Sequence, residues 1–351
     1  MHVLISGGSG FLGNAFSREI LARYRKQDKD MSVTWLTRDS SQAHPDEINM
    51  MTYDELATSD VSFDVILNLA GAGIADKRWS DERKEQLLAS RIKPTQSILD
   101  FIARTSTKPK LLVSGSAIGW YGTQGDKPLT ENSDYKEDFA HAMCQEWEDM
   151  ALRATEYDVP VAIVRTGVVI HPNGGMVAKL LLPFKFGVGG QLGDGQQIMS
   201  WISRNDWVSA VIFIIEQHLA NAKAAKYISE PVTDAMSLNE QALGSNVSND
   251  RVLSDRTSNN NSLKTQNNTA AVVYNLTAPE PVTNHTFTKA LGSWLHRPTV
   301  FTLPEFLLKL MFGEMSTLLI DGQKVLPKAL LEAGYSFEHT TLKQALEKQN
   351  Q

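Results

Sequence analysis

The chain has 351 residues, of which 42% are hydrophobic and 21% are charged, and its formal net charge is −6 at pH 7. This composition is typical of a soluble globular protein, and the length suits one large domain with a smaller one beside it. The acidic balance argues against nucleic acid or an anionic membrane as the primary partner. We therefore expect a small-molecule substrate, no nucleic-acid or membrane partner, and a monomer or homodimer.

A single cysteine, Cys144, is present. One cysteine excludes an intrachain disulfide and a cysteine-based zinc site, and it favours the reducing cytoplasm. The N-terminal stretch MHVLISGGSG has neither the basic start nor the cleavage-type end of a signal peptide. Because the apolar runs are also too short to span a bilayer, the sequence predicts a cytoplasmic protein.

The first 170 residues alternate between short apolar runs and helical patterns. Strands are expected at Val3–Ser6, Val33–Thr37, Val65–Leu69, Leu111–Ser114 and Val161–Arg165. Helices are expected at Leu12–Arg25, Asp81–Ala103 and Ala140–Glu156. This alternation predicts βαβ units and an α/β fold of the Rossmann type, with a doubly wound parallel sheet covered by helices on both faces.

Beyond residue 170 the pattern changes. Asn173–Gly175 and Gly187–Gly195 indicate loops, and later elements are expected at Asp206–His218 (helix), Val272–Leu276 (strand), Leu303–Met315 (helix) and Thr341–Lys348 (helix). Residues 223–269 are mostly rich in Asn and Ser and lack a period, which indicates a flexible polar insertion, with a binding loop as the alternative.

These segments divide the chain into two expected domains. Residues 1–170 form an NADP-binding Rossmann domain, to which segments near 201–222 and 270–280 return. Residues 171–200 and 281–351 form a smaller C-terminal substrate domain.

A glycine-rich turn, GGSGFLG, joins the first strand to the first helix. Gly7 permits the tight turn, Gly10 lets the backbone approach a pyrophosphate, and Gly13 allows close packing of helix on strand. Free N–H groups at the helix N-terminus then face the phosphates. The turn predicts a dinucleotide site that includes Gly7, Ser9, Gly10, Phe11, Leu12 and Gly13.

The end of the second strand bears on the choice of dinucleotide. An acid at this point usually binds the ribose of NAD, whereas this chain has Arg38 followed by Asp39. A guanidinium suits a 2′-phosphate, so NADP is favoured over NAD. A solvated role for Arg38, with Asp39 keeping NAD possible, is the alternative. Small residues at the end of the next strand, Leu69, Ala70 and Gly71, are expected to pass close to the cofactor.

Several motifs together resemble the extended short-chain dehydrogenase/reductase superfamily. They are GGSGFLG, LTR, NLAGAGI, VSGSAIGWYG and GDGQQIMSWI. Within it the chain is most similar to an atypical branch, the epimerase-family or nucleoside-diphosphate-sugar-epimerase-like proteins. The features shared with that branch are Arg78-Trp79, Ser90-Arg91, Trp147-Glu148, Gly174-Gly175 and Ser200-Trp201-Ile202.

The resemblance implies roles for several of these residues. Arg78, Trp79, Gly174, Gly175 and Trp201 are expected at the substrate, and Arg91 and Ser114 at the cofactor. Structural roles are the alternative, because arginines at element ends often form ion pairs and large aromatic residues at domain seams often belong to the core. The superfamily also carries a histidine where this chain has Ser203. Asp206, three residues later, is expected to be an acid at a helix N-terminus.

The resemblance fails at the residues that usually transfer the proton. Members of the superfamily use a serine, a tyrosine and a lysine, whereas this chain has Ala140 at the tyrosine position and Cys144 at the lysine position. Ser116 is retained and is expected to orient the reacting oxygen. Tyr121 is the candidate replacement acid, with a packing aromatic as the alternative, and Glu148 is expected as a structural carboxylate.

Two functions follow as hypotheses. The first is an NADP-dependent oxidoreductase or epimerase-like enzyme for a sugar nucleotide or related polar carbonyl or alcohol, with Ser116 and either Tyr121 or a bound water moving the proton. The second is a non-catalytic NADP(H)-binding sensor or regulator, which the branch links to cell division. No metal site is expected, since His141 and His171 have no partners at ligand spacing.

Overall fold

A seven-stranded parallel sheet forms the centre of the computed structural model, which describes residues 1–41, 43–229 and 271–347, with the backbone alone for 223–229. The strands lie in the order β12-β7-β5-β4-β1-β2-β3, and each neighbouring pair is parallel. They are β1 (His2–Ser6), β2 (Ser32–Thr37), β3 (Ile48–Thr52), β4 (Val65–Asn68), β5 (Leu111–Ala117), β7 (Val161–Thr166) and β12 (Ala271–Leu276). The predicted Rossmann-type fold is confirmed.

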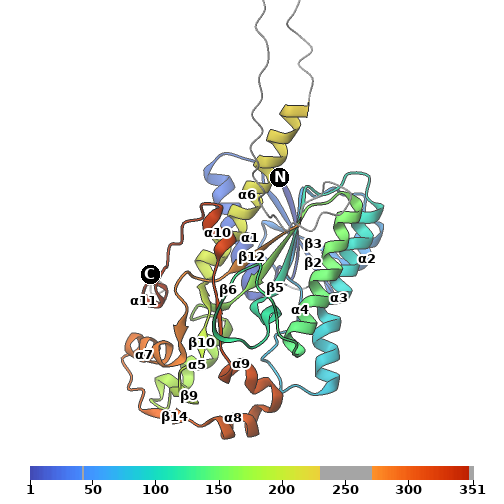
Figure 1. Cartoon of the computed structure of the whole chain (residues 1–351). Helices are drawn as coiled ribbons and strands as arrows, with labels where there is room; N and C mark the ends of the chain where they lie inside the picture. The colour runs from blue at the N-terminus through green and yellow to red at the C-terminus, as the bar shows by residue number, and fades with distance from the viewer. Residues whose placement is uncertain (42, 230–270, 348–351) are drawn as a thin grey trace, which may run out of the picture.

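Helices cover the sheet on both faces, which explains why its strands are apolar throughout. One face packs against α1 (Phe11–Lys26) and α6 (Arg204–Ser229), through core residues such as Phe16 and Trp207. The other face packs against α2 (Tyr53–Thr58), α3 (Asp81–Arg104) and α4 (Phe139–Leu152), through residues such as Leu56 and Ile98. Figure 1 shows α2, α3 and α4 on one side of the sheet and α1 and α6 on the other.

The strand order reverses between β1 and β4. The chain moves outward from β1 to β2 and β3, and then returns to the other side of β1 with β4. Ligands of open α/β sheets bind outside the carboxyl ends of the strands at such a reversal. The glycine turn after β1 and the segment after β4 meet there.

A smaller domain gathers at one end of the sheet (Figure 1). It contains three two-stranded pairs, β8 (Val168–Ile170) with β11 (Trp201–Ser203), β9 (Gly190–Leu192) with β14 (Phe301–Leu303), and β10 (Ile198–Met199) with β13 (Val282–Thr283). Its helices include α5 (Gly175–Lys185), α7 (Asn284–Leu295), α8 (Glu305–Phe312) and α9 (Thr317–Ile320). A separate core forms between these elements around Trp201, Phe184 and Phe287.

The last part of the chain returns to the Rossmann domain. β15 (Gln323–Val325) pairs with β6 (Gly125–Leu129), and α10 (Lys328–Glu332) packs beside β12. The final described helix is α11 (Leu342–Glu347), so the expected helix at Thr341–Lys348 begins one residue later, and Lys348 lies outside the described residues.

Some sequence-based boundaries were wrong. The helix expected at Leu303–Met315 is interrupted, because Pro304 stands before α8 and Gly313, at φ +58°, ends it. α6 continues to Ser229, so residues 223–229 of the expected insertion are helical, in agreement with an Ala- and Lys-rich sequence. The rest of that insertion, to residue 269, lies outside the described residues.

Other elements were missed altogether. α5 begins at Gly175, inside a stretch that indicated a loop, and it includes Pro183. β3 has five residues and α2 has six, which is too short for a clear periodic signal.

Candidate functional site

The glycine turn is tightly packed against the end of β4. Gly7 has φ +81°, and a Cβ atom there would lie 2.9 Å from the carbonyl carbon of Leu69. A Cβ atom on Gly13 would lie 2.4 Å from the carbonyl oxygen of Gly7. Gly10 precedes α1 without a side-chain cap, so the first-turn N–H groups of this helix remain available to an anion. The backbone thus has the shape that a bound pyrophosphate requires.

Gly174 and Gly175 lie against the same turn. A Cβ atom on Gly174 would lie 2.2 Å from the ring of Phe11, and the rings of Phe11 and His171 are 5.8 Å apart. These contacts place the start of α5 beside the glycine turn. The two glycines therefore lie beside the glycine turn, where they also adjoin the smaller domain.

The residues after β2 differ in their availability. The carboxylate of Asp39 accepts hydrogen bonds from the backbone N–H and the hydroxyl of Ser41, at 2.9 and 2.7 Å, and these bonds lower the pKa of Asp39. Arg38 is exposed, and no described residue forms a hydrogen bond or ion pair with its guanidinium. The Asp39 carboxylate is therefore already hydrogen-bonded within its own loop, whereas the Arg38 guanidinium is available to a ligand.

Arg91 lies beside Gly71, at the segment after β4. Its guanidinium donates to the carbonyl oxygens of Leu87 (2.8 Å) and Ala72 (3.2 Å), and it lies 5.3 Å from the ring centroid of Trp147. The Nε atom of Arg91, the Nε1 atom of Trp147 and the Oδ1 atom of Asn68 are buried and have no partner among the described residues. Two donors and an acceptor are therefore left for a ligand at this edge of the sheet.

Ser116 belongs to a buried polar cluster between β5, α4 and β7. Its hydroxyl donates to Glu148 Oε1 at 2.5 Å. Arg165 donates to both oxygens of the same carboxylate, at 2.9 and 2.8 Å, and its guanidinium lies 3.4 Å from the ring centroid of Trp120. The predicted structural role of Glu148 is thus more specific than a helix-face carboxylate, because the side chain fixes Ser116. The side chain of Ser114 is fully buried and makes only a 3.4 Å contact with the carbonyl of Gly115.

Tyr121 is fully buried beside this cluster. Its hydroxyl donates to Asn275 Oδ1 at 2.8 Å and accepts from Arg165 at 3.2 Å. Burial raises the pKa of Tyr121 to about 12. This geometry favours the packing role that the sequence left open, since a proton donor must reach its substrate.

Cys144 is buried on the same face of α4, one turn before Glu148. Burial, and then the nearby Glu148 carboxylate, raise the pKa of the thiol to about 11. A thiol with such a pKa is protonated at neutral pH and behaves as a small hydrophobic residue.

Both tryptophans predicted at the substrate are core residues. Trp201 belongs to the core of the smaller domain, and Trp79 packs with Met315 where the two domains meet. Trp201 is fully buried, and its Nε1–H donates to the carbonyl of Glu280 at 2.9 Å. Trp79 is 8% exposed, donates to the carbonyl of Ile74 at 3.0 Å and packs edge-on against Phe139. Their burial and satisfied N–H groups favour the core alternative. Arg78 is exposed and lies beside Gly313, between the two domains.

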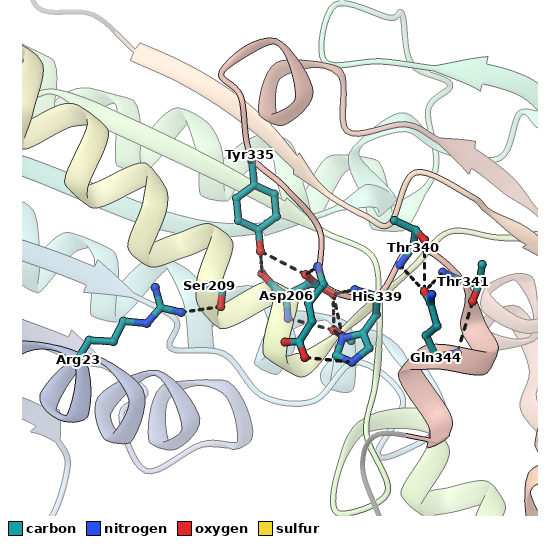
Figure 2. A network of polar contacts seen from close by, with 10 residues as sticks. Arg23, Asp206, Ser209, Tyr335, His339, Thr340, Thr341 and Gln344 are labelled. Atoms are coloured by element: carbon teal, nitrogen blue, oxygen red, sulfur yellow. Dashed lines mark hydrogen bonds and ion pairs between the residues drawn. The ribbon is translucent and has the colours of Figure 1, made fainter. Parts of the chain in front are cut away.

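A buried network around Asp206 joins the last segment of the chain to α6 (Figure 2). Its carboxylate accepts from the hydroxyl of Ser203 (2.7 Å), from the backbone N–H of His339 (3.0 Å) and from Tyr335 (3.3 Å). Because the Ser203 hydroxyl donates to Asp206, the Nδ1 atom of His339, 3.0 Å from it, must carry a proton. The sequence indicated Asp206 but not His339, which lies 133 residues further along the chain.

Two adjoining cavities of about 340 and 360 Å³ lie on this side of the molecule. Both are lined by Arg23, Ser209 and Glu338, so they run between α1, α6 and the last segment of the chain, away from Ser116. In the described part of the chain, no three His, Cys, Asp or Glu residues are placed to hold a metal ion. No helix there is long and apolar enough to cross a membrane.

Comparison with known proteins identifies relatives along the whole chain. A family model described as the NAD dependent epimerase/dehydratase family matches residues 3–227, and one described as a domain of unknown function (DUF1731) matches residues 303–349. An epimerase family protein of Mycobacterium bovis is 32% identical over 349 residues, covering 98% of this chain and 96% of its own length. A Staphylococcus haemolyticus epimerase family protein is 30% identical over 347 residues, covering 98% and 97%.

Solved structures show the same fold. The human epimerase family protein SDR39U1 (isoform 2), crystallised with NADPH, superposes with a TM-score of 0.77 at 26% identity, covering 99% of this chain and 98% of its own. A UDP-glucuronic acid 4-epimerase of Bacillus cereus, in complex with UDP-glucuronic acid and NAD, has a TM-score of 0.66 at 14% identity, covering 99% and 97%. The second likeness extends to the fold alone.

Proposed function

Because the chain belongs to the NAD dependent epimerase/dehydratase family, we propose that it binds NADP(H) and oxidises or reduces a sugar nucleotide or a related polar carbonyl or alcohol. The observation that carries this proposal is the retained Ser116, fixed by Glu148 at the carboxyl edge of the sheet. A protein that only stored the cofactor would not need an oriented hydroxyl at the point where hydride is exchanged.

The residues after β1, β2 and β4 fit the cofactor. The glycine turn, with Ser9, Phe11 and Leu12, would hold the pyrophosphate on the N-terminus of α1, and Arg38 would pair with the 2′-phosphate. The unpartnered Nε atom of Arg91 and Nε1 atom of Trp147 would donate to hydroxyl or carbonyl groups of the ligand. NADPH bound to the human relative agrees with this choice of cofactor.

Ser116 and Glu148 would take the place of the missing tyrosine and lysine. When bound, NADPH would supply the hydride for reduction and NADP⁺ would accept it in oxidation. Since the Ser116 hydroxyl donates to Glu148, its oxygen presents only lone pairs to a substrate, and so it accepts a hydrogen bond from a substrate alcohol. As the alcohol is oxidised, its proton would pass to Ser116 Oγ while the serine proton moves transiently to Glu148 Oε1. It then leaves to water, because the ion pair with Arg165 favours the charged carboxylate. Reduction of a carbonyl follows the reverse path.

The groups around Glu148 suit this role. Arg165 holds the carboxylate by two hydrogen bonds, so the acceptor oxygen stays aligned with Ser116. Tyr121 contributes to the packing of Arg165 and takes no part in proton transfer. The substrate would lie between Ser116 and the smaller domain, with Arg78 and the start of α5 at Gly174 and Gly175 on its far side.

A non-catalytic NADP(H) sensor is the second candidate. Ser116 is only 5% exposed and its hydroxyl is already bonded, which are features of a structural serine. In that case cofactor binding would act through the smaller domain, which contacts the glycine turn at Gly174.

One assay separates the two candidates. Purified protein is mixed with NADPH and with a panel of ketosugar nucleotides and polar carbonyl compounds, and the loss of NADPH absorbance is followed. We expect turnover with at least one compound, and a loss of about 100-fold in Ser116→Ala, as befits removal of a positioned acid–base group. Ser209→Ala, which removes a serine hydroxyl at the two cavities that lie away from Ser116, is the control. Tight NADPH binding without turnover across the panel would establish the sensor instead.

A further inference from the structure

The smaller domain exposes a set of large apolar side chains that its own core does not cover. Phe186 and Val300 are each 75% exposed and Phe306 is 71% exposed. We define the apolar face as these residues together with their exposed neighbours Leu182, Val188, Phe301, Leu310 and Met311. Scattered exposed apolar residues are ordinary, but a concentration of this kind marks a binding surface.

Backbone contacts bring together the segments that carry the apolar face. β9 and β14 are paired, with Phe301 opposite Gly190, so the strand that carries Phe301 lies beside the segment that follows Val188. The N–H of Gly193 donates to the carbonyl of Leu303 at 2.9 Å, which brings the start of α8 to the same place. α5, β9, β14 and α8 lie together at one end of the molecule (Figure 1).

The apolar face has a positively charged rim. Segments 175–193 and 281–304, which carry most of it, contain no Asp or Glu, although the whole chain has 40 acidic and 34 basic residues. Lys185, Lys289 and Arg297 are exposed, and none of them forms an ion pair with a described residue. Arg297 donates instead to the carbonyl of Lys185, and Lys289 to the carbonyl of Thr299. The local charge is therefore opposite to that of the chain as a whole.

α8 has the pattern of a helix that lies on an interface. Phe306, Leu310 and Met311 are exposed, whereas Leu308 is buried and anchors the helix. The two charged residues on this helix, Glu305 and Lys309, pair with each other at 3.4 Å. A short amphipathic helix with phenylalanine and leucine outward and cations beside it is typical of peripheral contact with lipid.

We propose that the apolar face binds the surface of an anionic phospholipid bilayer. The phenylalanine and aliphatic side chains enter the boundary between headgroups and acyl chains, and Lys185, Lys289 and Arg297 contact the lipid phosphates. The acidic remainder of the molecule is repelled by the same surface, which fixes the orientation. The net charge of the chain led us to expect no membrane partner. Electrostatic attraction to a membrane decays within a Debye length, however, so the charge of the contacting surface decides binding.

A second copy of the chain fits this surface less well. A two-fold interface would place the same three cations of both copies in one contact, and like charges there oppose association. Anionic lipid supplies the opposite charge without a specific partner sequence.

Co-sedimentation of the full chain with vesicles tests the proposal. We expect binding to vesicles of phosphatidylcholine mixed with phosphatidylglycerol, no binding to pure phosphatidylcholine, and weaker binding as salt is raised. The double variant Phe186→Asp/Phe306→Asp should reduce the bound fraction about tenfold, and Lys185→Glu/Arg297→Glu should do the same through charge. Val61→Asp, which alters an exposed apolar residue of the Rossmann domain (43% exposed), is the matched control.

Three results would overturn the proposal. They are binding that is equal for both vesicle types, binding that the Phe186→Asp/Phe306→Asp variant retains in full, and a dimer in solution that this variant dissociates. NADPH affinity and thermal midpoint, measured on every variant, show that the fold is intact, and they keep this test independent of the proposed enzymatic function.

Discussion

Glu148 illustrates how one side chain acquires its role from its neighbours. On α4 it sits one turn after Cys144, and the helix pattern alone indicates only an inward-facing acid. In the folded protein it is bonded to Ser116 and Arg165, from two different strands. A buried carboxylate is stable only when it is paired in this way, so the pairing that keeps it charged also orients the serine.

At Arg38, a prediction concerns cofactor choice. Replacing it with alanine should weaken NADPH binding by about ten- to 100-fold, because charge-assisted hydrogen bonds to the 2′-phosphate are lost. NADH affinity should change little. Titration of both cofactors by fluorescence measures the ratio, with Asp39→Ala as a control that should preserve it. An equal loss for NADH and NADPH would show that Arg38 does not contact the 2′-phosphate.

Tyr121 gives a prediction about alkaline pH. Its pKa is about 12 in the folded protein and about 10 in an unfolded chain. The unfolded state therefore loses the proton first as the pH rises, and the stability present below pH ~10 is lost between pH ~10 and ~12, by up to about 3 kcal/mol. Urea unfolding of wild type and Tyr121→Phe should show a difference in free energy that is constant to pH ~10 and then shrinks. A difference independent of pH would mean that the hydroxyl is not buried as described.

At the scale of elements, the glycine turn couples β1, α1 and β4. Gly7 and Gly13 let two backbones approach more closely than any side chain would permit. This close packing of the two backbones leaves the N-terminus of α1 open where the strand order reverses. Gly7 and Gly13 therefore serve both the packing and the proposed binding of an anion.

Gly7→Ala and Gly187→Ala form a matched pair that separates backbone strain from packing. Both glycines have positive φ, +81° and +75°, but only a Cβ atom on Gly7 meets the backbone of Leu69. Gly187→Ala should cost about 1 kcal/mol of folding free energy from strain alone, and Gly7→Ala clearly more. Only Gly7→Ala should abolish NADPH binding, as measured by calorimetry. Similar losses in the two variants would rule out the close approach.

At the scale of the whole molecule, the last described segment is held to the Rossmann domain by Asp206. Figure 2 shows Tyr335 and His339 turned toward this carboxylate at the start of α6. The imidazole of His339 reaches Ser203, the position at which the superfamily carries a histidine in sequence. A histidine side chain from the C-terminal segment thus lies against Ser203.

Asp206→Ala should release this segment. The change leaves several buried donors without a partner, so the free energy of unfolding should fall by about 3 kcal/mol or more. Hydrogen exchange should accelerate over residues 335–347. Gln344→Ala, which removes only the side-chain contacts with Thr340 and Thr341, should affect α11 alone. Unchanged exchange around His339 in Asp206→Ala would contradict a holding role for the carboxylate.

The sequence by itself determined the Rossmann-type sheet, the glycine turn and the family, because these depend on local periodicity and on glycines whose spacing is set by one turn between a strand and a helix. It also predicted that Ser116 is retained and that Ala140 and Cys144 stand at the tyrosine and lysine positions. Contiguous residues carry all of this information.

Only the tertiary structure decided how polar side chains from distant segments meet. Ser116 with Glu148 and Arg165, Tyr121 with Asn275, and Ser203 with His339 are pairs formed by packing, and burial then sets their charge and availability. The apolar face is of the same kind, since its residues come from α5 and the loop after it, from β14 and the residue before it, and from α8. The sequence specifies the chemistry of each side chain. Desolvation and proximity, which create a site or a surface, arise only when the chain folds.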